Sequence, residues 1–221
     1  MRDTYHEQLA EVADGLIEMS RLVGSAVSKA TTALLDADLG AAEAVITGDE
    51  AVNALYKHID QSAVMLLARQ QPVASDLRTI LTGLRMSNDL ERVGDYAVHI
   101  AKVARRRHPA SVVPVALRST MLEMGQAAAR IAVKAGTVIA TRDLTLAAQL
   151  LADDDTIDDL HASLLQALLD RSNDFGVEAT IDLALVGRYY ERLADHATSI
   201  SHAVTYLVTG EHTDPESYAA E

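Results

Sequence analysis

Apolar side chains recur along most of the chain at steps of three and four residues. The first such run extends from Leu9 to Leu34, and similar runs follow it to about residue 208. This spacing places the apolar positions on one stripe of a helix, as in helices that pack into a bundle. Turn and linker residues interrupt the runs near 36–40, 70–72, 108–114, 141–143 and 173–176. The pattern therefore predicts an all-α fold of six helices.

Particular residues mark the predicted helix ends. Asp38 is expected to cap the second helix through its side-chain oxygen, and Gly210 to end the sixth in a left-handed conformation. Pro72 is expected in the first turn of the third helix, where its missing N–H costs nothing. We expect residues 211–221 to form a disordered acidic tail. The third helix is expected to end in a solvated basic run, with docking of an anionic partner as the alternative: Arg105, Arg106 and Arg107.

The second half of the chain repeats the first. With a shift of 105 residues, Asp38 falls on Asp143 and Leu55 on Leu160. With a shift of 100 residues, the third predicted helix falls on the sixth. A duplicated three-helix unit explains both shifts. We therefore predict two tandem three-helix bundles, at 1–108 and 114–210.

Composition narrows the function classes. The formal net charge is −13, which argues against binding to nucleic acid, because phosphate contacts need Lys and Arg. The same charge suits cations or a basic partner. The chain has no cysteine, so disulfides and thiolate metal ligands are excluded. The N-terminus lacks the apolar segment of a signal peptide, and no uncharged apolar run approaches the ~20 residues of a membrane span. We expect a cytoplasmic protein without a transmembrane segment.

One acidic phrase occurs in both halves, as Glu-Arg followed by an apolar residue, a small residue and Asp. It places Glu91 and Asp95 one helical turn apart in the first half, and Glu191 and Asp195 in the second. Two carboxylates on one face repel each other unless a cation or a basic group lies between them. The repeated phrase is therefore a candidate cation site.

The second helix of each half carries matching groups at the same spacing. Asp49 and Asn53 lie four residues apart, as do Asp154 and Asp158. If the second and third helices of each half are antiparallel neighbours, three or four oxygen ligands gather on one surface. Such ligands suit Mg²⁺, Ca²⁺ or Mn²⁺ and are accepted by iron, whereas zinc prefers His or Cys.

Simpler interpretations apply to the same residues. Single acidic pairs on helices are usually solvated, and Arg92 and Arg192 could turn each motif into a lattice of ion pairs. Asp158 and His161 have the carboxylate–histidine spacing of di-iron bundles, but the first half has no such pair. We therefore interpret His161 as an ordinary surface histidine. Repetition of the acidic pairs in both halves favours metal binding over a solvated face.

Residues 71–78 read Gln-Pro-Val-Ala-Ser-Asp-Leu-Arg, and residues 89–95 read Asp-Leu-Glu-Arg-Val-Gly-Asp. On these residues the sequence resembles the PhoU family of phosphate-transport regulators. The resemblance extends to about Gly210. The second copy of the acidic phrase departs from the family pattern, because Ala194 replaces the usual glycine before Asp195.

The resemblance implies a cytoplasmic, dimeric adaptor between the ATPase of the phosphate ABC transporter and a sensor histidine kinase. Such an adaptor associates peripherally with membrane complexes and holds the phosphate-starvation response off when phosphate is plentiful. The family's acidic motifs imply metal sites, for iron, magnesium, manganese or zinc, at the eight positions named above. Asn53 stands where a carboxylate is usual, so the first site is expected to bind more weakly. The rival interpretations are a carboxylate-bridged di-metal oxidoreductase and a purely structural bundle.

Overall fold

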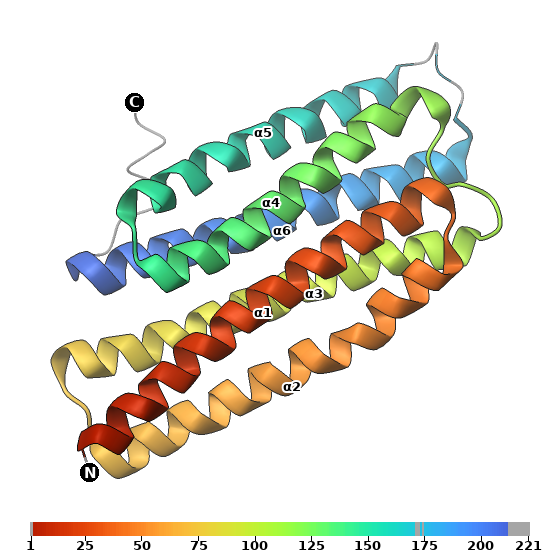
Figure 1. Cartoon of the computed structure of the whole chain (residues 1–221). Helices are drawn as coiled ribbons and strands as arrows, with labels where there is room; N and C mark the ends of the chain where they lie inside the picture. The colour runs from red at the N-terminus through yellow and green to blue at the C-terminus, as the bar shows by residue number, and fades with distance from the viewer. Residues whose placement is uncertain (1, 171–172, 174, 212–221) are drawn as a thin grey trace.

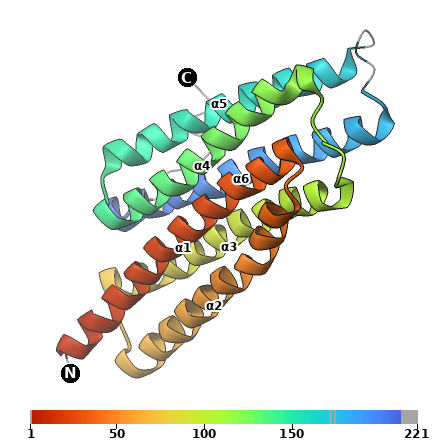
Figure 2. The same cartoon turned by 45° about the vertical axis from the view of Figure 1, so that its right-hand side comes forward.

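In the computed structural model, which describes residues 2–170, 173 and 175–211, six long α-helices form two three-helix bundles that lie side by side (Figures 1 and 2). The all-α prediction and the prediction of two three-helix units are confirmed. The division into two domains, at 1–108 and 114–210, stays a prediction. The helices are α1 (Arg2–Asp36), α2 (Leu39–Gln70), α3 (Ala74–Arg107), α4 (Arg118–Thr141), α5 (Leu144–Leu169) and α6 (Val177–Thr209), with a short 3₁₀ turn at Val115–Leu117.

The helix ends agree with the sequence except at Pro72. Asp38 caps α2 by accepting a hydrogen bond from the Ala41 N–H at 2.9 Å. Gly210 ends α6 with a φ of 81°. The expectation for Pro72 is wrong: it lies before α3, because Val73 is extended and the helix begins only at the next residue. Most of the predicted acidic tail, residues 212–221, lies outside the described residues.

The two bundles share one hydrophobic core. Helix α1 packs on α4 and α3 packs on α6, so these four helices form the centre of the molecule. Helices α2 and α5 lie on opposite outer sides (Figure 1), each covering its own bundle. The buried apolar residues of all six helices form a single cluster. The halves are therefore joined by core packing as well as by the connecting chain.

Small residues allow α1 and α4 to approach closely. A Cβ atom built on Gly125 would lie 2.8 Å from the Cβ of Thr31, and one on Gly136 would lie 2.8 Å from the Cβ of Ser20. Side chains at both glycines would therefore clash with α1. Thr31 also bonds the fully buried Tyr190 of α6, with 2.8 Å between the two hydroxyl oxygens.

Ion pairs join the C-terminal end of α3 to the N-terminal end of α6. Arg106 and Arg107 both pair with Asp182, whose side chain is only 8 % exposed, and Arg107 also pairs with Glu178. Arg105 pairs with Glu43 of α2 at 3.4 Å. Arg105 and Arg106 are exposed, as expected for a solvated helix end, and all three arginines of the run also form ion pairs. Because α6 runs antiparallel to α3, its acidic first turns face the basic last turn of α3, which also suits both helix dipoles.

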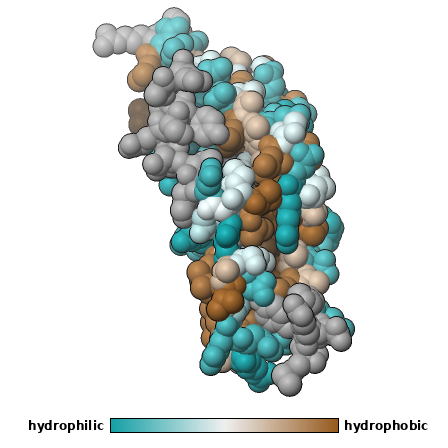
Figure 3. All heavy atoms as spheres, turned by 90° about the vertical axis from the view of Figure 1, so that its left-hand side faces the viewer, coloured by the Kyte–Doolittle hydropathy of each residue, from teal (hydrophilic) through white to brown (hydrophobic). Residues whose placement is uncertain are grey.

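An apolar cavity of about 470 Å³ lies between the bundles where α1 begins and α6 ends. Figure 3 views this end of the molecule and shows a band of hydrophobic side chains bordered by hydrophilic ones. The cavity is lined by, among others, Leu9, Val12, Leu16, Met86, Val204 and Leu207.

Among the described residues, no helix combines the length and hydrophobicity needed to cross a lipid bilayer.

Candidate metal centres

Each outer helix, α2 and α5, has one carboxylate within the stripe of apolar residues that packs against its own bundle, which we call its seam. On α2, Asp49 lies four residues after the buried Val45 and three before the buried Val52. On α5, Asp154 has the same place between the buried Leu150 and Ile157. These are positions where a bundle helix normally carries an apolar residue. The duplicated fold therefore directs one carboxylate of each outer helix toward its own bundle.

The first cluster lies between α2 and α3. Asp49 is close enough to Glu91 and Asp95 for their charges to interact. Asn53 donates a hydrogen bond from Nδ2 to Asp49 Oδ2 at 2.7 Å. Gly94 lies between the acidic residues of α3, and a Cβ there would lie 3.5 Å from Asp49 Oδ1. All four predicted residues of this site are therefore brought to one place.

The second cluster lies between α5 and α6 and is more acidic. Asp154 interacts electrostatically with Asp158, Asp195 and Glu191. Buried oxygens in this cluster, Asp154 Oδ1 and Glu191 Oε2, have no hydrogen-bond partner within the described part of the chain. A buried oxygen without a partner costs free energy, which a bound cation would recover. The four predicted residues of the second site are also brought together.

Burial and mutual repulsion make these carboxyls hard to ionise. Burial raises the pKa of Asp154 to about 7, and the charges of Asp158 and Asp195 add to the rise. The pKa values of four further carboxyls are raised, in each case by burial first and then by the aspartate at the centre of the same cluster, Asp95 or Asp195. These four are Asp49, Glu91, Asp158 and Glu191.

Arginines neutralise only the α3 and α6 side of each cluster. Arg92 pairs with Asp95 at 3.2 Å, and Arg192 pairs with Asp195 at 3.0 Å. Arg188 pairs with Glu191. Asp154, on the opposite helix, has no ion pair within the described residues. The predicted ion-pair lattice is therefore present on one side only, and each cluster keeps an excess of negative charge.

His161 belongs to the second cluster and is not an ordinary surface residue. Its position on α5 is one heptad after Asp154, so it lies on the same inward seam. Its charge interacts with those of Asp158 and Glu191. A Cβ on Gly187 of α6 would lie 3.1 Å from the His161 ring. The surface interpretation is wrong. It was based on the spacing of Asp158 and His161 alone and did not consider that His161 lies on the face of α5 that packs toward α6.

The residues fit a hard cation by their chemistry. Each cluster offers carboxylate oxygens that repel one another, and the second also offers two partnerless oxygens and an imidazole. Within the described residues, however, no three carboxylate or imidazole groups stand close enough to hold a metal ion as they are. Metal binding therefore requires the side chains to draw together, and the metal sites stay a prediction.

Sequence reasoning missed an aromatic cluster where α3 and α6 cross. The Tyr96 and His196 rings stack with centroids 5.9 Å apart, and the His99 and Tyr189 rings stack at 5.2 Å. His196 Nδ1 also lies 3.0 Å from Asp89 Oδ1. Tyr96 follows Asp95 in the chain and His196 follows Asp195, so this cluster lies directly between the two acidic sites. The duplicated phrase contained the signal, an aromatic or imidazole ring directly after each Asp.

Comparison with known proteins gives one family. The PhoU domain model matches residues 16–104 and 121–204, one match for each bundle. The phosphate-specific transport system accessory protein PhoU homolog 2 of Mycobacterium tuberculosis is 44% identical over 210 residues, covering 95% of this chain and 99% of that protein. PhoU homolog 1 of Mycobacterium leprae is 42% identical over 217 residues, covering 98% of each chain.

Solved structures agree with this result. The crystal structure of PhoU from Pseudomonas aeruginosa superposes with a TM-score of 0.85 at 30% identity, over 94% of this chain and 100% of that one. The phosphate transport system regulatory protein PhoU from Streptococcus pneumoniae gives the same TM-score at 25% identity, over 95% of this chain and 99% of that one. Sequence, fold and duplication agree along nearly the whole length, and the chain belongs to the PhoU family.

Proposed function

We propose that this protein is a non-enzymatic negative regulator of the phosphate-starvation response and of phosphate uptake. It acts as a cytoplasmic homodimeric adaptor, in peripheral contact with the ATPase of the phosphate ABC transporter and with a sensor histidine kinase. The observation that carries the proposal is family membership along both bundles, with relatives named as accessory proteins of the phosphate-specific transport system.

Metal binding at the two acidic clusters is the second part of the proposal. Asp49, Glu91 and Asp95, with the amide oxygen of Asn53, hold one site, and Asp154, Asp158, Glu191 and Asp195 hold the other. A bound cation would offset carboxylate repulsion between α2 and α3 and between α5 and α6. Such a cation stabilises the folded bundle, because a ligand that binds only the folded state raises its stability. Iron, magnesium, manganese and zinc are the metals to compare.

The regulatory role is tested with a phosphate-starvation reporter in a deletion strain grown in ample phosphate. We expect high reporter expression without the gene and normal expression after the gene is restored. Unchanged expression in the deletion strain, and also in a strain lacking every paralogue, would contradict the regulatory role.

Alanine substitutions test the metal sites: Glu91→Ala with Asp95→Ala, and Glu191→Ala with Asp195→Ala. We expect each pair to lower the metal content of the purified protein. Oxygen consumption by iron-loaded protein, with turnover beyond the bound iron, would favour the oxidoreductase alternative. Among the described residues, one histidine interacts electrostatically with each cluster, His196 with Glu91 and His161 with Asp158 and Glu191.

A further inference from the structure

The second acidic cluster has an imidazole on its seam. His161 lies on α5 between the buried Ile157 and Leu164. It follows Asp154 by seven residues, or two helical turns, so both side chains lie on the same face of the helix. Asp158 precedes His161 by three residues, which is the carboxylate–histidine spacing of metal sites in helical bundles. On α5 alone, a nitrogen donor therefore lies beside two carboxylates.

A glycine on α6 leaves space for the His161 ring. A Cβ on Gly187 would lie 3.1 Å from Cδ2 of the ring and 3.6 Å from Nε2, so this edge of the ring faces α6. Gly187 lies one helical turn before Glu191, so the edge faces the helix surface that carries carboxylates of the cluster. Within the described part of the chain, no hydrogen bond or ion pair engages either ring nitrogen. The lone pair of an imidazole nitrogen is therefore available to a metal ion.

Unpartnered oxygens belong to the carboxylates around this ring. Asp154 Oδ1 and Glu191 Oε2 are buried and have no hydrogen-bond partner among the described residues. His161 lies within electrostatic range of Asp158 and Glu191. A cation at this place would meet oxygen donors from α5 and α6 together with one nitrogen donor. Zinc and iron accept such a mixed set, whereas Mg²⁺ prefers oxygen ligands alone.

The first cluster has no nitrogen donor at the matching position. With the shift of 105 residues, His161 corresponds to Tyr56 of α2, and with the shift of 100 residues, Gly187 corresponds to Ser87 of α3. Ser87 is fully buried, and its hydroxyl donates a hydrogen bond to the Leu84 carbonyl at 2.8 Å. A phenol thus replaces the imidazole, and a buried side chain stands where the second bundle has a glycine.

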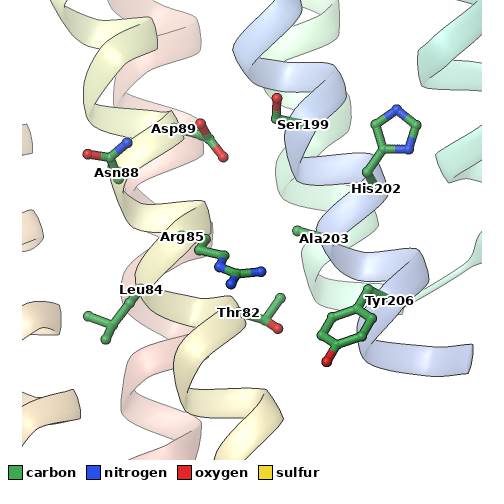
Figure 4. A pocket seen from close by; sticks show the side chains of 9 residues that line it. All are labelled: Thr82, Leu84, Arg85, Asn88, Asp89, Ser199, His202, Ala203 and Tyr206. Atoms are coloured by element: carbon green, nitrogen blue, oxygen red, sulfur yellow. The ribbon is translucent and has the colours of Figure 1, made fainter. Parts of the chain in front are cut away.

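The histidine nearest the first cluster belongs to the contact between the bundles. His196 comes from α6, whereas the cluster lies between α2 and α3, and its Nδ1 is 3.0 Å from Asp89 Oδ1. Asp89 extends from α3 toward α6 and lines the pocket of about 480 Å³ between these two helices (Figure 4). The His196 ring also stacks on Tyr96. The four predicted ligands of the first cluster therefore offer oxygen donors only.

We propose that His161 is a metal ligand of the second cluster and gives the two sites different selectivity. The second site binds Zn²⁺ or Fe²⁺ through oxygen and nitrogen donors, and its ratio of Zn²⁺ to Mg²⁺ affinity exceeds that of the first site. This inference rests on the proposed metal binding, but it concerns a residue outside the duplicated acidic motifs. The regulatory role is measured separately, with the reporter.

Isothermal titration calorimetry with Zn²⁺ and Mg²⁺ measures the selectivity of the second site. The full chain carries Glu91→Ala with Asp95→Ala, so that the second cluster is the one left intact. In this protein we expect His161→Gln to lower the Zn²⁺ affinity at least about tenfold, because an oxygen replaces the nitrogen donor, and to change the Mg²⁺ affinity less than about twofold. The matched control is His58→Gln, which removes an exposed histidine of α2 and is expected to change neither affinity.

Nuclear magnetic resonance of protein with ¹⁵N-labelled histidine gives a direct readout on the chain with both clusters intact. We expect one imidazole nitrogen of His161 to change its chemical shift on addition of Zn²⁺, and the His161→Gln variant assigns this resonance. Circular dichroism shows whether each variant keeps its fold. If the variants used for calorimetry do not fold, the resonance in the parent protein still decides the question.

Each negative result has a distinct meaning. Equal Zn²⁺ affinities with and without His161→Gln, or a His161 resonance that Zn²⁺ does not shift, overturn the ligand role and leave metal binding in place. An equal loss of Zn²⁺ and Mg²⁺ affinity in His161→Gln overturns the selectivity, as does an equal loss of Zn²⁺ affinity in His58→Gln. Absence of binding for both metals overturns this inference together with the proposed metal sites, and the reporter still tests the regulatory role.

Discussion

Replacement of Asp154 by Asn tests the electrostatics of the second acidic cluster directly. The substitution keeps the shape of the side chain and removes one repelled charge. In metal-free protein at pH 8, we expect the variant to be more stable than the parent. At pH 4 we expect the two proteins to differ little, because this pH is close to the ordinary pKa of 3.8 and the loss of stability has only begun to develop.

The magnitude follows from the raised pKa. Above pH 7, a rise from the ordinary 3.8 to about 7 corresponds to about 4 kcal/mol of lost stability at 1.36 kcal/mol per pH unit. Asp154 is only half-buried, and solvent screening reduces this to about 2 kcal/mol. The loss develops between pH 4 and pH 7, where the unfolded chain ionises first and the folded protein keeps its proton. For a chain of this length, 2 kcal/mol shifts the melting temperature by about 4 °C.

Urea denaturation followed by circular dichroism, with chelator at pH 4 and pH 8, measures the difference. Asp60→Asn, which removes an exposed charge from α2, is the matched control and is expected to change stability by less than about 0.5 kcal/mol. Added Mn²⁺ should stabilise the parent protein, by about 2.7 kcal/mol at a hundredfold excess over the dissociation constant, and the variant less. If Asp154→Asn is no more stable than the parent at pH 8, the argument from carboxylate repulsion is refuted.

Three further substitutions test other parts of the molecule. Asn53→Asp gives the first cluster a fourth carboxylate. Calorimetry should show tighter binding of divalent cations, and the metal-free protein should be less stable at pH 8. Unchanged affinity would contradict the assignment of residue 53 as a ligand. Gly125→Ala should cost about 1–3 kcal/mol in urea denaturation, because its Cβ would clash with α1, whereas Gly48→Ala, with nothing within 4 Å, should gain up to about 1 kcal/mol; equal effects would refute the close approach. Asp182→Asn should cost about 2 kcal/mol, since Arg106 loses a buried charged partner, and a change below about 0.5 kcal/mol would show that the pair is not structural.

The fold could be predicted from the sequence because helices that pack in a bundle have apolar residues at steps of three and four. The apolar stripe from Leu9 to Leu34 and the shifts of 105 and 100 residues predicted the six helices and their arrangement in two units. The contact between the units left no comparable signal. In the sequence, Gly125 and Gly136 are simply residues of low helix propensity. Their role becomes clear only in the structure, where they pack against Thr31 and Ser20 of the neighbouring helix α1.

The residues of the two acidic clusters could also be predicted from the sequence, since the duplication repeats them. The residues that surround the clusters were harder to predict. His161 faces the second cluster because α5 presents one seam to α6, and this follows from packing rather than from the spacing of one carboxylate–histidine pair. The ion pairs of the arginines at the end of α3 were not predicted, because Asp182 and Glu178 lie more than 70 residues away in the sequence.

The α1–α4 contact bears on how the duplicated chain could diverge. Ser20 and Gly125 are equivalent positions under the shift of 105 residues, and so are Thr31 and Gly136. Yet Ser20 meets Gly136 and Thr31 meets Gly125, so each contact joins a hydroxyl residue of one copy to a glycine of the other. Two identical chains meeting through this surface would have to place the same residues on both sides. Within a single chain that restriction does not apply, so α1 supplies the hydroxyl side chains and α4 the glycines against which they pack.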